Sequence, residues 1–483
     1  MFNLINNSIF NFEKNKKTIS KEQFIQNTID EFNLSNARML MIEGEKYYRN
    51  ENNISNRVIY KYENERKVVD TDKPNNKINH AFMKNAVDEK ISYFLGQPLT
   101  ITSTNKKLQE LAVETLTDEF DDIINDIGVE ASNKGIAWLH VYIDEFGELG
   151  FINIPSEQII PIWSDLAHAK MDALIRYYYI DVYEGLELKK VMKVEYWEDN
   201  TVMYYVESEN GLIPDIEANE IGEHIGHFNI NGIENGWGKI PYIPFKNNSY
   251  ELPDLYFVKD IIDQYDKITS DNSNLLDEIQ NVIYVLKNYG GTNLSDFIRD
   301  LNFYKAIKVD DDGGVDTLSA NINIEASERT LDRLKNDFYQ FGQAVDIDTD
   351  RFGQSPSGVA LEFLYSKLKL KVDNMERKFK RSFKLLFYFL CEYYSISNQG
   401  VFNPNDLKVT FTRSTISNLK ENIETVNLAT NLISKKTALE HHPWVDDVES
   451  EVKNIEDEVN SIDFNTLDYE ENEDSNSLIG RRS

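Results

Sequence analysis

The 483-residue chain is longer than one hydrophobic core ordinarily serves, so the sequence predicts two or more structural units. Its 41% apolar and 12% aromatic residues supply packed interiors and exclude an intrinsically disordered protein. Asp and Glu outnumber Lys and Arg by 82 to 51, and the net charge of −31 disfavours tight nucleic-acid binding, because an acidic surface repels phosphate.

Neither export nor membrane insertion is predicted. Residues 1–7 are interrupted by polar side chains, unlike a signal peptide, and no stretch approaches the roughly 20 apolar residues that cross a bilayer. The single cysteine, Cys391, lies in an apolar run, so we expect a small buried side chain rather than a nucleophile. These features are typical of a protein made and kept in a reducing, aqueous compartment.

The first half of the chain carries helix signals and then strand signals. Apolar residues recur at helical spacing in the segments 21–32, 36–48, 79–95, 106–116 and 119–133. From residue 135 the period changes to two, which predicts strands. The expected strands are 136–143 and 149–154, paired as a hairpin, followed by 173–182, 189–197 and 201–207. The sequence therefore predicts a mixed α+β domain over residues 1–252.

The second half is predicted to be mostly helical. Helix 254–278 has its apolar residues on one side, and helix 327–345 has apolar residues at spacings of three and four, which is typical of helices that pack nearly parallel. The residues available for a helix contact on these two faces include Val258, Ile261, Ile262, Tyr265, Leu331, Leu334, Phe338 and Phe341. Residues 279–325 are predicted to form a small α/β module between the two helices, with strands at 281–287, 303–309 and 315–320 and a short helix at 294–302.

A polar loop and a long helix follow. After the acidic residues of the loop 346–356, Ser355 and Pro356 offer an N-cap and a first-turn proline, so we expect a helix from 357 to about 394. A strand is expected within 407–412, and the segment 357–414 thus contains the long helix and a return strand. Further helices are expected at 417–433, 436–441 and 445–462. Residues 463–483 begin with a run of acidic side chains and few apolar ones, which predicts a disordered tail.

The search for catalytic and cofactor motifs gives a negative result. Residues 232–239 imitate a P-loop, but five residues rather than four precede Gly238, and Ile240 stands where Ser or Thr would hold the metal ion. We expect a glycine-rich loop there instead. Residues 346–350 begin like a calcium loop, but Arg351 and Ser357 occupy positions that require Gly and Glu. We therefore expect no catalytic residues, no metal site and no cofactor.

Two further features have both an ordinary and a functional interpretation. His224 and His227 are the one close, non-adjacent histidine pair, and we favour surface-loop histidines over a metal site. The helix after residue 357 carries a run of cations, which could face DNA. We favour a solvated face, or one that pairs with acidic groups of a neighbouring subunit, because the opposite side is apolar. The cations are Lys367, Lys369, Lys371, Arg377, Lys378, Lys380, Arg381 and Lys384.

The order of these parts resembles the portal proteins of tailed bacteriophages, and in particular those of siphophages that infect Gram-positive bacteria. The likeness covers about residues 30–460. No single motif is diagnostic, but the ordered set is specific. The segments that carry the resemblance are 79–98, 133–143, 154–161, 283–289, 313–318 and 375–378.

The resemblance implies a fold class, an α+β subunit with wing, stem, clip and crown around a central tunnel. By this resemblance residues 1–252 look like the wing, and 253–278 and 326–345 look like two stem helices. Residues 279–325 look like the clip, 346–356 like the tunnel loop, and 357–414 like the long helix with its return strand. Residues 415–462 look like the crown, and 463–483 form the tail.

Site residues also follow from the resemblance. The tunnel loop would place Asp346, Asp348, Asp350, Arg351, Phe352 and Gln354 toward DNA. The clip would dock the packaging motor or the adaptor through Tyr284, Lys287, Asn288, Tyr289 and Lys308. The eight residues of the helix contact would pack the stem.

The resemblance further implies a function without enzymatic activity. The expected assembly is a ring of about twelve copies at one capsid vertex, the channel for DNA packaging and ejection. Its expected partners are the terminase motor, the head-tail adaptor, capsid and scaffolding proteins, and double-stranded DNA as a passenger, with no membrane. We expect it in the virion, assembled in the host cytoplasm. Two alternatives remain: another neck or minor head protein of the virion, and a metal-dependent hydrolase built from the many carboxylates.

Overall fold

The computed structural model describes residues 19–166, 168, 170–218, 224–230, 232–279, 283–287, 314–318, 324–346 and 358–414, and shorter stretches between 423 and 457. The chain divides into two compact units. The first unit contains Met1–Asp346 and Lys367–Ser414, and the second contains Ile347–Ser366 and Thr415–Ser483. The larger first unit holds almost all of the elements discussed below.

Five helices of the first unit confirm the predicted segments to within three residues at each end. They are α2 (Lys21–Asn33), α3 (Asn36–Tyr48), α4 (Phe82–Leu95), α5 (Lys106–Thr115) and α6 (Asp118–Lys134). Helix α2 begins at a capping box, in which the Ser20 hydroxyl accepts from Gln23 N while the Gln23 side chain accepts from Ser20 N. Helix α6 ends at Gly135, whose φ of +86° and close approach to the Glu251 backbone exclude a side chain.

Two antiparallel sheets form the centre of this unit. The larger sheet has the order β10-β9-β8-β7-β6, with β11 paired to β9, and the smaller has the order β14-β4-β5. The larger consists of β6 (Ile159–Trp163), β7 (Met171–Glu184), β8 (Glu187–Trp197), β9 (Thr201–Ser208), β10 (Gly211–Pro214) and β11 (Ile225–Gly226). The smaller consists of β4 (Ile136–Ile143), β5 (Leu149–Ile154) and β14 (Tyr242–Lys246). The predicted hairpin of β4 and β5 is thereby confirmed.

Hydrophobic clusters bind these layers together. Helix α2 buries Phe24 and Ile29 against Tyr177 and Val194 of the larger sheet. A second cluster joins the two sheets, because Trp138 and Tyr242 of the smaller sheet pack with residues of the larger one such as Leu174. Short hairpins flank the core: β1 (Tyr60–Glu63) with β2 (Arg66–Val69), and β12 (Phe228–Ile230) with β13 (Ile233–Asn235).

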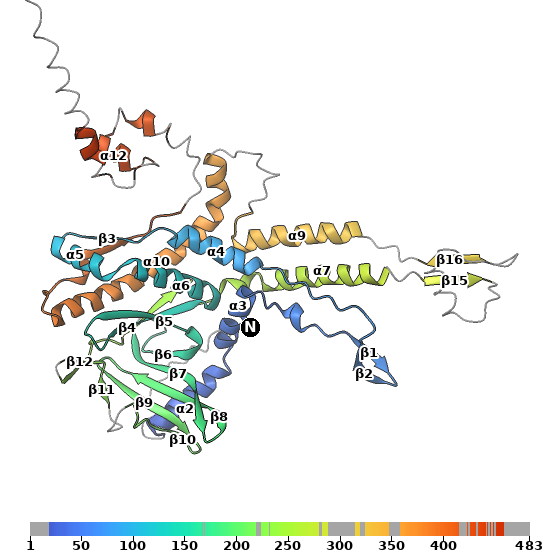
Figure 1. Cartoon of the computed structure of the whole chain (residues 1–483), viewed down its shortest axis with the longest axis horizontal. Helices are drawn as coiled ribbons and strands as arrows, with labels where there is room; N and C mark the ends of the chain where they lie inside the picture. Colours follow the sequence, from blue (N-terminus) through green and yellow to red (C-terminus); the bar gives the residue numbers. More distant parts are fainter. Residues whose placement is uncertain are drawn as a thin grey trace, which may run out of the picture. The chain divides into compact units, whose positions relative to one another are not determined.

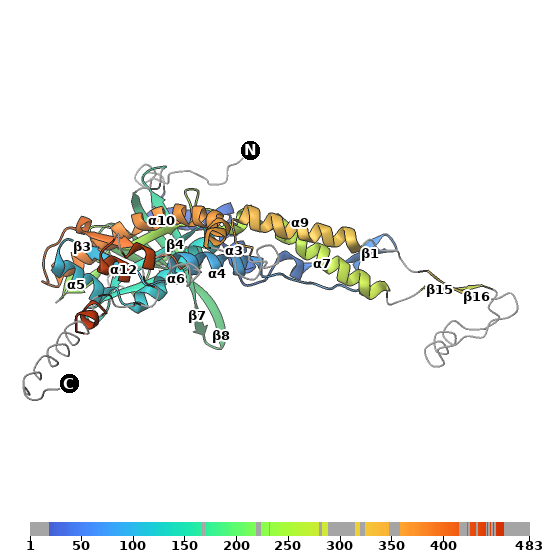
Figure 2. The ribbon, with the colours of Figure 1, turned by 90° about the horizontal axis from the view of Figure 1, so that it is seen from above.

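The second half supplies long helices. Helix α7 (Lys259–Ile279), helix α9 (Ile324–Gly342) and helix α10 (Gly358–Ile396) confirm the three predicted rods, and α10, at 39 residues, is about 58 Å long. Figures 1 and 2 show α7 and α9 side by side in both views. Strands β15 (Ile283–Lys287) and β16 (Gly314–Leu318) pair antiparallel and confirm two strands of the predicted module. Strand β17 (Leu407–Thr410) returns to pair with β3 (Thr100–Ser103).

One expected boundary is wrong. The first long helix was expected from residue 254, but Asp254–Phe257 forms a 3-10 turn, η3, and α7 begins at Lys259. Asp254 is buried at this turn. In the second unit, α12 (Lys435–Glu440) matches the expected helix at 436–441. The predicted strand 303–309, the short helix 294–302 and the tail lie outside the described residues.

Phe379 generates a prediction about stability. Its ring lies 5.2 Å from that of Phe94 in α4 and 5.0 Å from that of Phe245 in β14, and it is fully buried. Replacing it by alanine leaves a cavity where α4, α10 and β14 meet, so Phe379→Ala should lower the unfolding free energy by about 3–5 kcal/mol in chemical denaturation. Leu370→Ala on the exposed side of α10 is the control, and equal losses in both variants would contradict this core.

Candidate functional site at the base of the α7–α9 pair

The two helices α7 and α9 run antiparallel. Gly342, at the end of α9, lies against Val258, just before α7, so closely that an added Cβ would stand 3.4 Å from the Val258 Cγ1 atom. Farther along, the Ser327 hydroxyl donates to Asn272 Oδ1 at 2.9 Å. The contacts at both positions fix the direction of the pair, which extends about 30 Å along α7.

The residues expected at the helix contact differ in burial. Val258, Ile262 and Phe338 are buried, whereas the Phe341 side chain is 57% exposed. The remaining expected contact residues, all partly exposed, are Ile261, Tyr265, Leu331 and Leu334. Phe82, at the start of α4, joins the two helices, since its ring lies 5.0 Å from that of Tyr265 and 4.7 Å from that of Phe338.

A polar row on α7 binds an extended segment from the first quarter of the chain. The backbone N–H groups of Asn76, Ile78 and His80 donate to the side chains of Asn274, Ser270 and Asp266, at 2.7, 3.0 and 3.1 Å. Two residues of extended chain advance about 6.6 Å, and four residues of helix advance about 6.0 Å. Every second residue of the segment therefore meets every fourth residue of α7, and we call this arrangement the α7 ladder.

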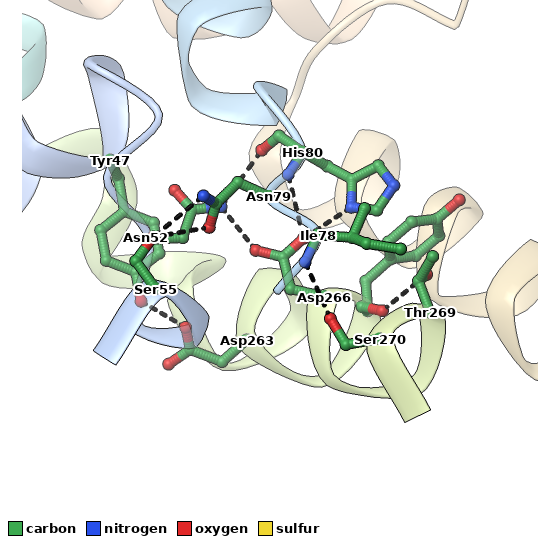
Figure 3. A network of polar contacts seen from close by, with 11 residues as sticks. Tyr47, Asn52, Ser55, Ile78, Asn79, His80, Asp263, Asp266, Thr269 and Ser270 are labelled. Atoms are coloured by element: carbon green, nitrogen blue, oxygen red, sulfur yellow. Dashed lines mark hydrogen bonds and ion pairs between the residues drawn. The ribbon is translucent and has the colours of Figure 1, made fainter. Parts of the chain in front are cut away.

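Asp266 is the centre of the α7 ladder, as Figure 3 shows. Its side chain is fully buried. Oδ1 accepts from His80 N and lies 2.7 Å from His80 Nδ1, and Oδ2 accepts from Asn52 Nδ2 at 2.6 Å. Because both carboxylate oxygens are bonded, the charge is satisfied without water, and the chain around residues 52 and 80 is tied to one helix.

Asp263, one turn earlier, repeats the pattern on the neighbouring α3 and η1 (Asn53–Asn56). The Tyr47 hydroxyl donates to its carboxylate, and Asn53 Nδ2 donates to Oδ2 at 3.2 Å. Burial, with the hydrogen bond to Asp263, raises the pKa of Tyr47 well above its usual range. The Tyr47 phenol thus stays a hydrogen-bond donor at any physiological pH. Farther along α7, Arg57 forms an ion pair with Asp271.

A buried ionic cluster holds the point where α7 begins. Asp254 Oδ2 lies 2.9 Å from Lys90 Nζ of α4 and 3.0 Å from Lys371 Nζ of α10, and Oδ1 accepts from Asn247 Nδ2 at 2.9 Å. Lys90 is completely buried and also donates to Asn247 Oδ1 and to Ser132 Oγ. One carboxylate therefore joins two helices to the start of a third.

The charges of this cluster depend on each other. Burial lowers the pKa of Lys90 to about 8, against the opposing attraction of Asp254. Burial by itself would raise the pKa of Asp254, but Lys371 and Lys90 outweigh it and hold that pKa well below the ordinary 3.8. At neutral pH the site thus contains an ionised Asp254 between two cations.

The end of α9 is held by the same two helices. Lys371 Nζ donates to Gly342 O at 2.9 Å, which satisfies a terminal carbonyl of α9, and Glu89 of α4 accepts from Val345 N at 3.2 Å. Burial raises the pKa of Glu89. The start of α7 and the end of α9 are consequently fixed to α4 and α10, and the arrangement suits a rigid mechanical support.

The predicted tunnel-loop and clip residues fall largely beyond what can be described. Asp346 is partly exposed, one residue after Val345, and Asp348, Asp350, Arg351, Phe352 and Gln354 lie outside the described residues. Tyr284 and Lys287 belong to β15, and Asn288, Tyr289 and Lys308 lie outside the described residues. Their roles stay predictions.

Two interpretations from the sequence need correction. Lys371 neither faces solvent nor awaits a neighbouring subunit, since it binds Asp254 within the same chain. His227, by contrast, is a partly exposed loop residue as expected, in a bend between β11 and β12; its Nε2 lies 2.9 Å from Glu198 O, and burial lowers its pKa to about 4. The glycine-rich segment 232–239 is not simply a loop, because Ile233–Asn235 forms a strand.

Other expectations for single residues and motifs are met or left open. Cys391 is buried, as expected, and burial raises its thiol pKa to about 11. Among the described residues, no group of three or more His, Cys, Asp or Glu side chains has the geometry to hold a metal ion. Within the same part of the chain, no helix has the length and apolar character that a bilayer span requires.

Comparisons with known proteins agree with one another. The model of the family described as "Phage portal protein, SPP1 Gp6-like" matches residues 33–463. The portal protein of Bacillus phage SPP1 is 37% identical over 457 residues, which cover 93% of this chain and 89% of that protein. The portal protein of Clostridium phage phiCD119 is 34% identical over 459 residues, 89% of this chain and 96% of that protein.

The α7 ladder generates a prediction about thermal stability. Asp266→Ala removes the acceptor shared by Asn52 Nδ2, His80 N and His80 Nδ1, and a buried donor left without a partner costs about 1–3 kcal/mol. We expect a clearly lower melting temperature in calorimetry, while Asp260→Ala, at an exposed position of α7, melts like the wild type. Equal melting of the two variants would show that the ladder adds no stability.

The ionic cluster generates a prediction about pH. Because the pKa of Asp254 is depressed in the folded state, its contribution is present above the ordinary pKa of 3.8 and disappears as the pH falls below it. Asp254→Asn should cost about 3–5 kcal/mol at pH 7, since it leaves two cations without their carboxylate. The gap in melting temperature to the wild type should shrink below about pH 4; a gap that is constant from pH 7 to pH 3 would refute an ionised Asp254.

Proposed function

The chain belongs to the SPP1 Gp6-like family of phage portal proteins, and from this premise we propose how its parts form the channel for DNA packaging and ejection. A portal protein is a component of the phage capsid, and family membership favours a homo-oligomeric ring over a compact monomer. The alternative, another neck or minor head protein, receives no support from the family match. We propose a ring of about twelve copies, the number that the family resemblance implies.

In this proposal α7 and α9 are the stem helices. The observation that carries the proposal is the anchorage of their base: the α7 ladder on one side, and the Asp254 cluster with Glu89 on the other. The start of α7 and the end of α9 are both fixed at this base, and the ladder holds α7 as far as Asn274. Many such pairs, side by side around an axis, would give a stiff wall around a bore wide enough for a double helix.

The other parts follow the order of the chain. We propose residues 1–252 as the wing, 279–325 as the clip, 346–356 as the tunnel loop, and 415–462 as the crown. The clip would dock the terminase motor during packaging and the head-tail adaptor afterwards. Capsid and scaffolding proteins would surround the wing, and assembly would take place in the host cytoplasm.

The charge of the chain supports passage of DNA rather than adhesion. Duplex DNA carries one negative charge per about 1.7 Å, and a strongly basic wall would hold it in deep energy wells. The net charge of −31 per subunit instead favours smooth sliding. The sequence contains no nucleotide-binding motif, so the force would come from an external ATPase.

The ring itself is the first functional prediction. Negative-stain or cryo-electron microscopy of the purified full-length protein should show rings with a central opening. Charge repulsion between acidic copies is screened by salt, so the ring fraction should rise between about 50 mM and 500 mM NaCl. Compact monomers without an opening at every concentration would refute the proposed assembly.

The tunnel loop generates a second functional prediction. Replacing residues 346–356 by a Gly-Ser linker should leave rings intact and should impair DNA packaging, because the loop would narrow the bore and retain the DNA. DNA content per particle measures the effect. A deletion of residues 475–483 serves as control, and normal packaging by the loop variant would contradict this role.

A further inference from the structure

A basic cavity lies in the first unit, and no residue of α7 or α9 is among those that line it. It has a volume of about 760 Å³ and is lined by residues of α10, β6, β14 and the loops next to them. In a chain of net charge −31, six of its lining residues are cations. They are Lys170, Lys239, Lys246, Lys378, Arg381 and Lys384.

Most of these cations are available to a ligand. Lys246 binds Glu251 at 2.7 Å, and Lys239 lies 3.7 Å from the Tyr388 ring centre. Among the residues that the structure describes, Lys378, Arg381 and Lys384 form no ion pair with a carboxylate of this chain. They follow one another at intervals of three along α10 and so span about 9 Å.

Few anionic residues line the cavity. Of the described lining residues, one is a carboxylate, Asp199, and it is exposed. Burial lowers the pKa of Lys239, against the opposing effect of Glu392 and Asp199. Lys378, Arg381 and Lys384 thus have no carboxylate partner among the described residues, and a negatively charged group entering the cavity would be attracted.

Part of the lining is apolar. Trp163 and Ile240 are buried, and Met171, Pro244 and Leu385 are partly buried beside them. The Trp163 ring is kept in place by stacking with His168, whose ring centre lies 4.9 Å away, and by Lys246 at 5.0 Å. A ligand that fits must therefore present apolar side chains as well as anionic groups.

These features point to a class of ligand. A cavity of this size accommodates a few side chains or a small molecule, not the side of a duplex, and phosphate backbones offer no apolar groups to bury. Nucleotide phosphates favour helix N-termini, where backbone N–H groups are free, but these cations come from the middle of α10. Lysines and an arginine on a solvent-facing helix surface suit separate carboxylates.

We propose that this cavity binds an acidic peptide segment of a partner protein, one in which aromatic or aliphatic side chains stand between Asp and Glu residues. The carboxylates would pair with Lys378, Arg381 and Lys384, and an apolar side chain would contact Trp163 and Ile240. The inference goes beyond the channel function, because the cavity lies apart from the α7–α9 pair. Its failure would leave the proposed stem untouched.

A labelled peptide tests the proposal on the full-length protein. The probe has the sequence of residues 463–474, which places Phe464, Leu467 and Tyr469 among six acidic residues and is chosen for this chemistry alone. Fluorescence anisotropy should show saturable binding that weakens as NaCl rises from about 50 mM to 500 mM. The same peptide with every Asp and Glu changed to Asn and Gln should bind at least tenfold more weakly.

Three double variants locate the site. Lys378→Glu with Arg381→Glu should weaken binding at least tenfold, whereas Lys369→Glu with Arg377→Glu, an equal change of charge outside the cavity on the same helix, should leave binding within twofold. Lys378→Gln with Arg381→Gln repeats the test with neutral side chains, in case charge reversal disturbs folding. Circular dichroism melts and ring images check that each variant is native.

Three outcomes would overturn the inference. They are no saturable peptide binding, equal loss in the cavity and control variants, and displacement of the peptide by a 20-base-pair duplex or by ATP in a manner that depends on Lys378 and Arg381. The last outcome would assign the cavity to phosphates instead of carboxylates.

Discussion

The structure depends on a match of spacing between a helix and an extended chain. Asp266, Ser270 and Asn274 stand four residues apart on α7, and the amides of His80, Ile78 and Asn76 stand two apart on the segment that crosses it. A strand in a sheet would find these acceptors on another backbone, but here side chains of a helix supply them. Since an unpaired buried amide is costly, the segment is held in one register along α7, and α7 is held to the body of the subunit.

Buried charge gives this support its specificity rather than its strength. A hydrophobic replacement of Asp254, Lys90 and Lys371 could be as stable, because the desolvation of three ions consumes much of their attraction. Yet a carboxylate that must meet both cations allows one arrangement of α4, α10 and the start of α7. Apolar contacts such as those of Phe82 with Tyr265 and Phe338 would let the helices slide along one another. The ion cluster prevents such sliding, which suits helices that bear a mechanical load.

Periodicity in the sequence could predict the rods but not their anchorage. The spacing of its apolar residues predicts the buried side of α7. Its polar side has the composition of any solvated helix face, and nothing in the sequence near Asp266 indicates that its partners lie at residues 52 and 80. The sequence does not predict strand β14, because Pro244 argues against a strand. An edge position, as in the order β14-β4-β5, nevertheless tolerates proline. The sequence does not predict the β1–β2 hairpin either, because its turn places Asn64 and Glu65 at positive φ without the usual glycine.

The distribution of cations connects these observations. Three cations form ion pairs inside the subunit. Lys134 has three carboxylate partners, and Lys90 and Lys371 both bind Asp254. Lys378, Arg381 and Lys384 are gathered at one cavity. Some cations of this acidic chain are therefore taken up by ion pairs inside the subunit, and others are gathered at the cavity. In the proposed channel these cations would attract DNA only within about 8–10 Å in physiological salt. A partner that carries carboxylates can still be held firmly, because the cations that would bind it are concentrated where only a small protruding segment can enter.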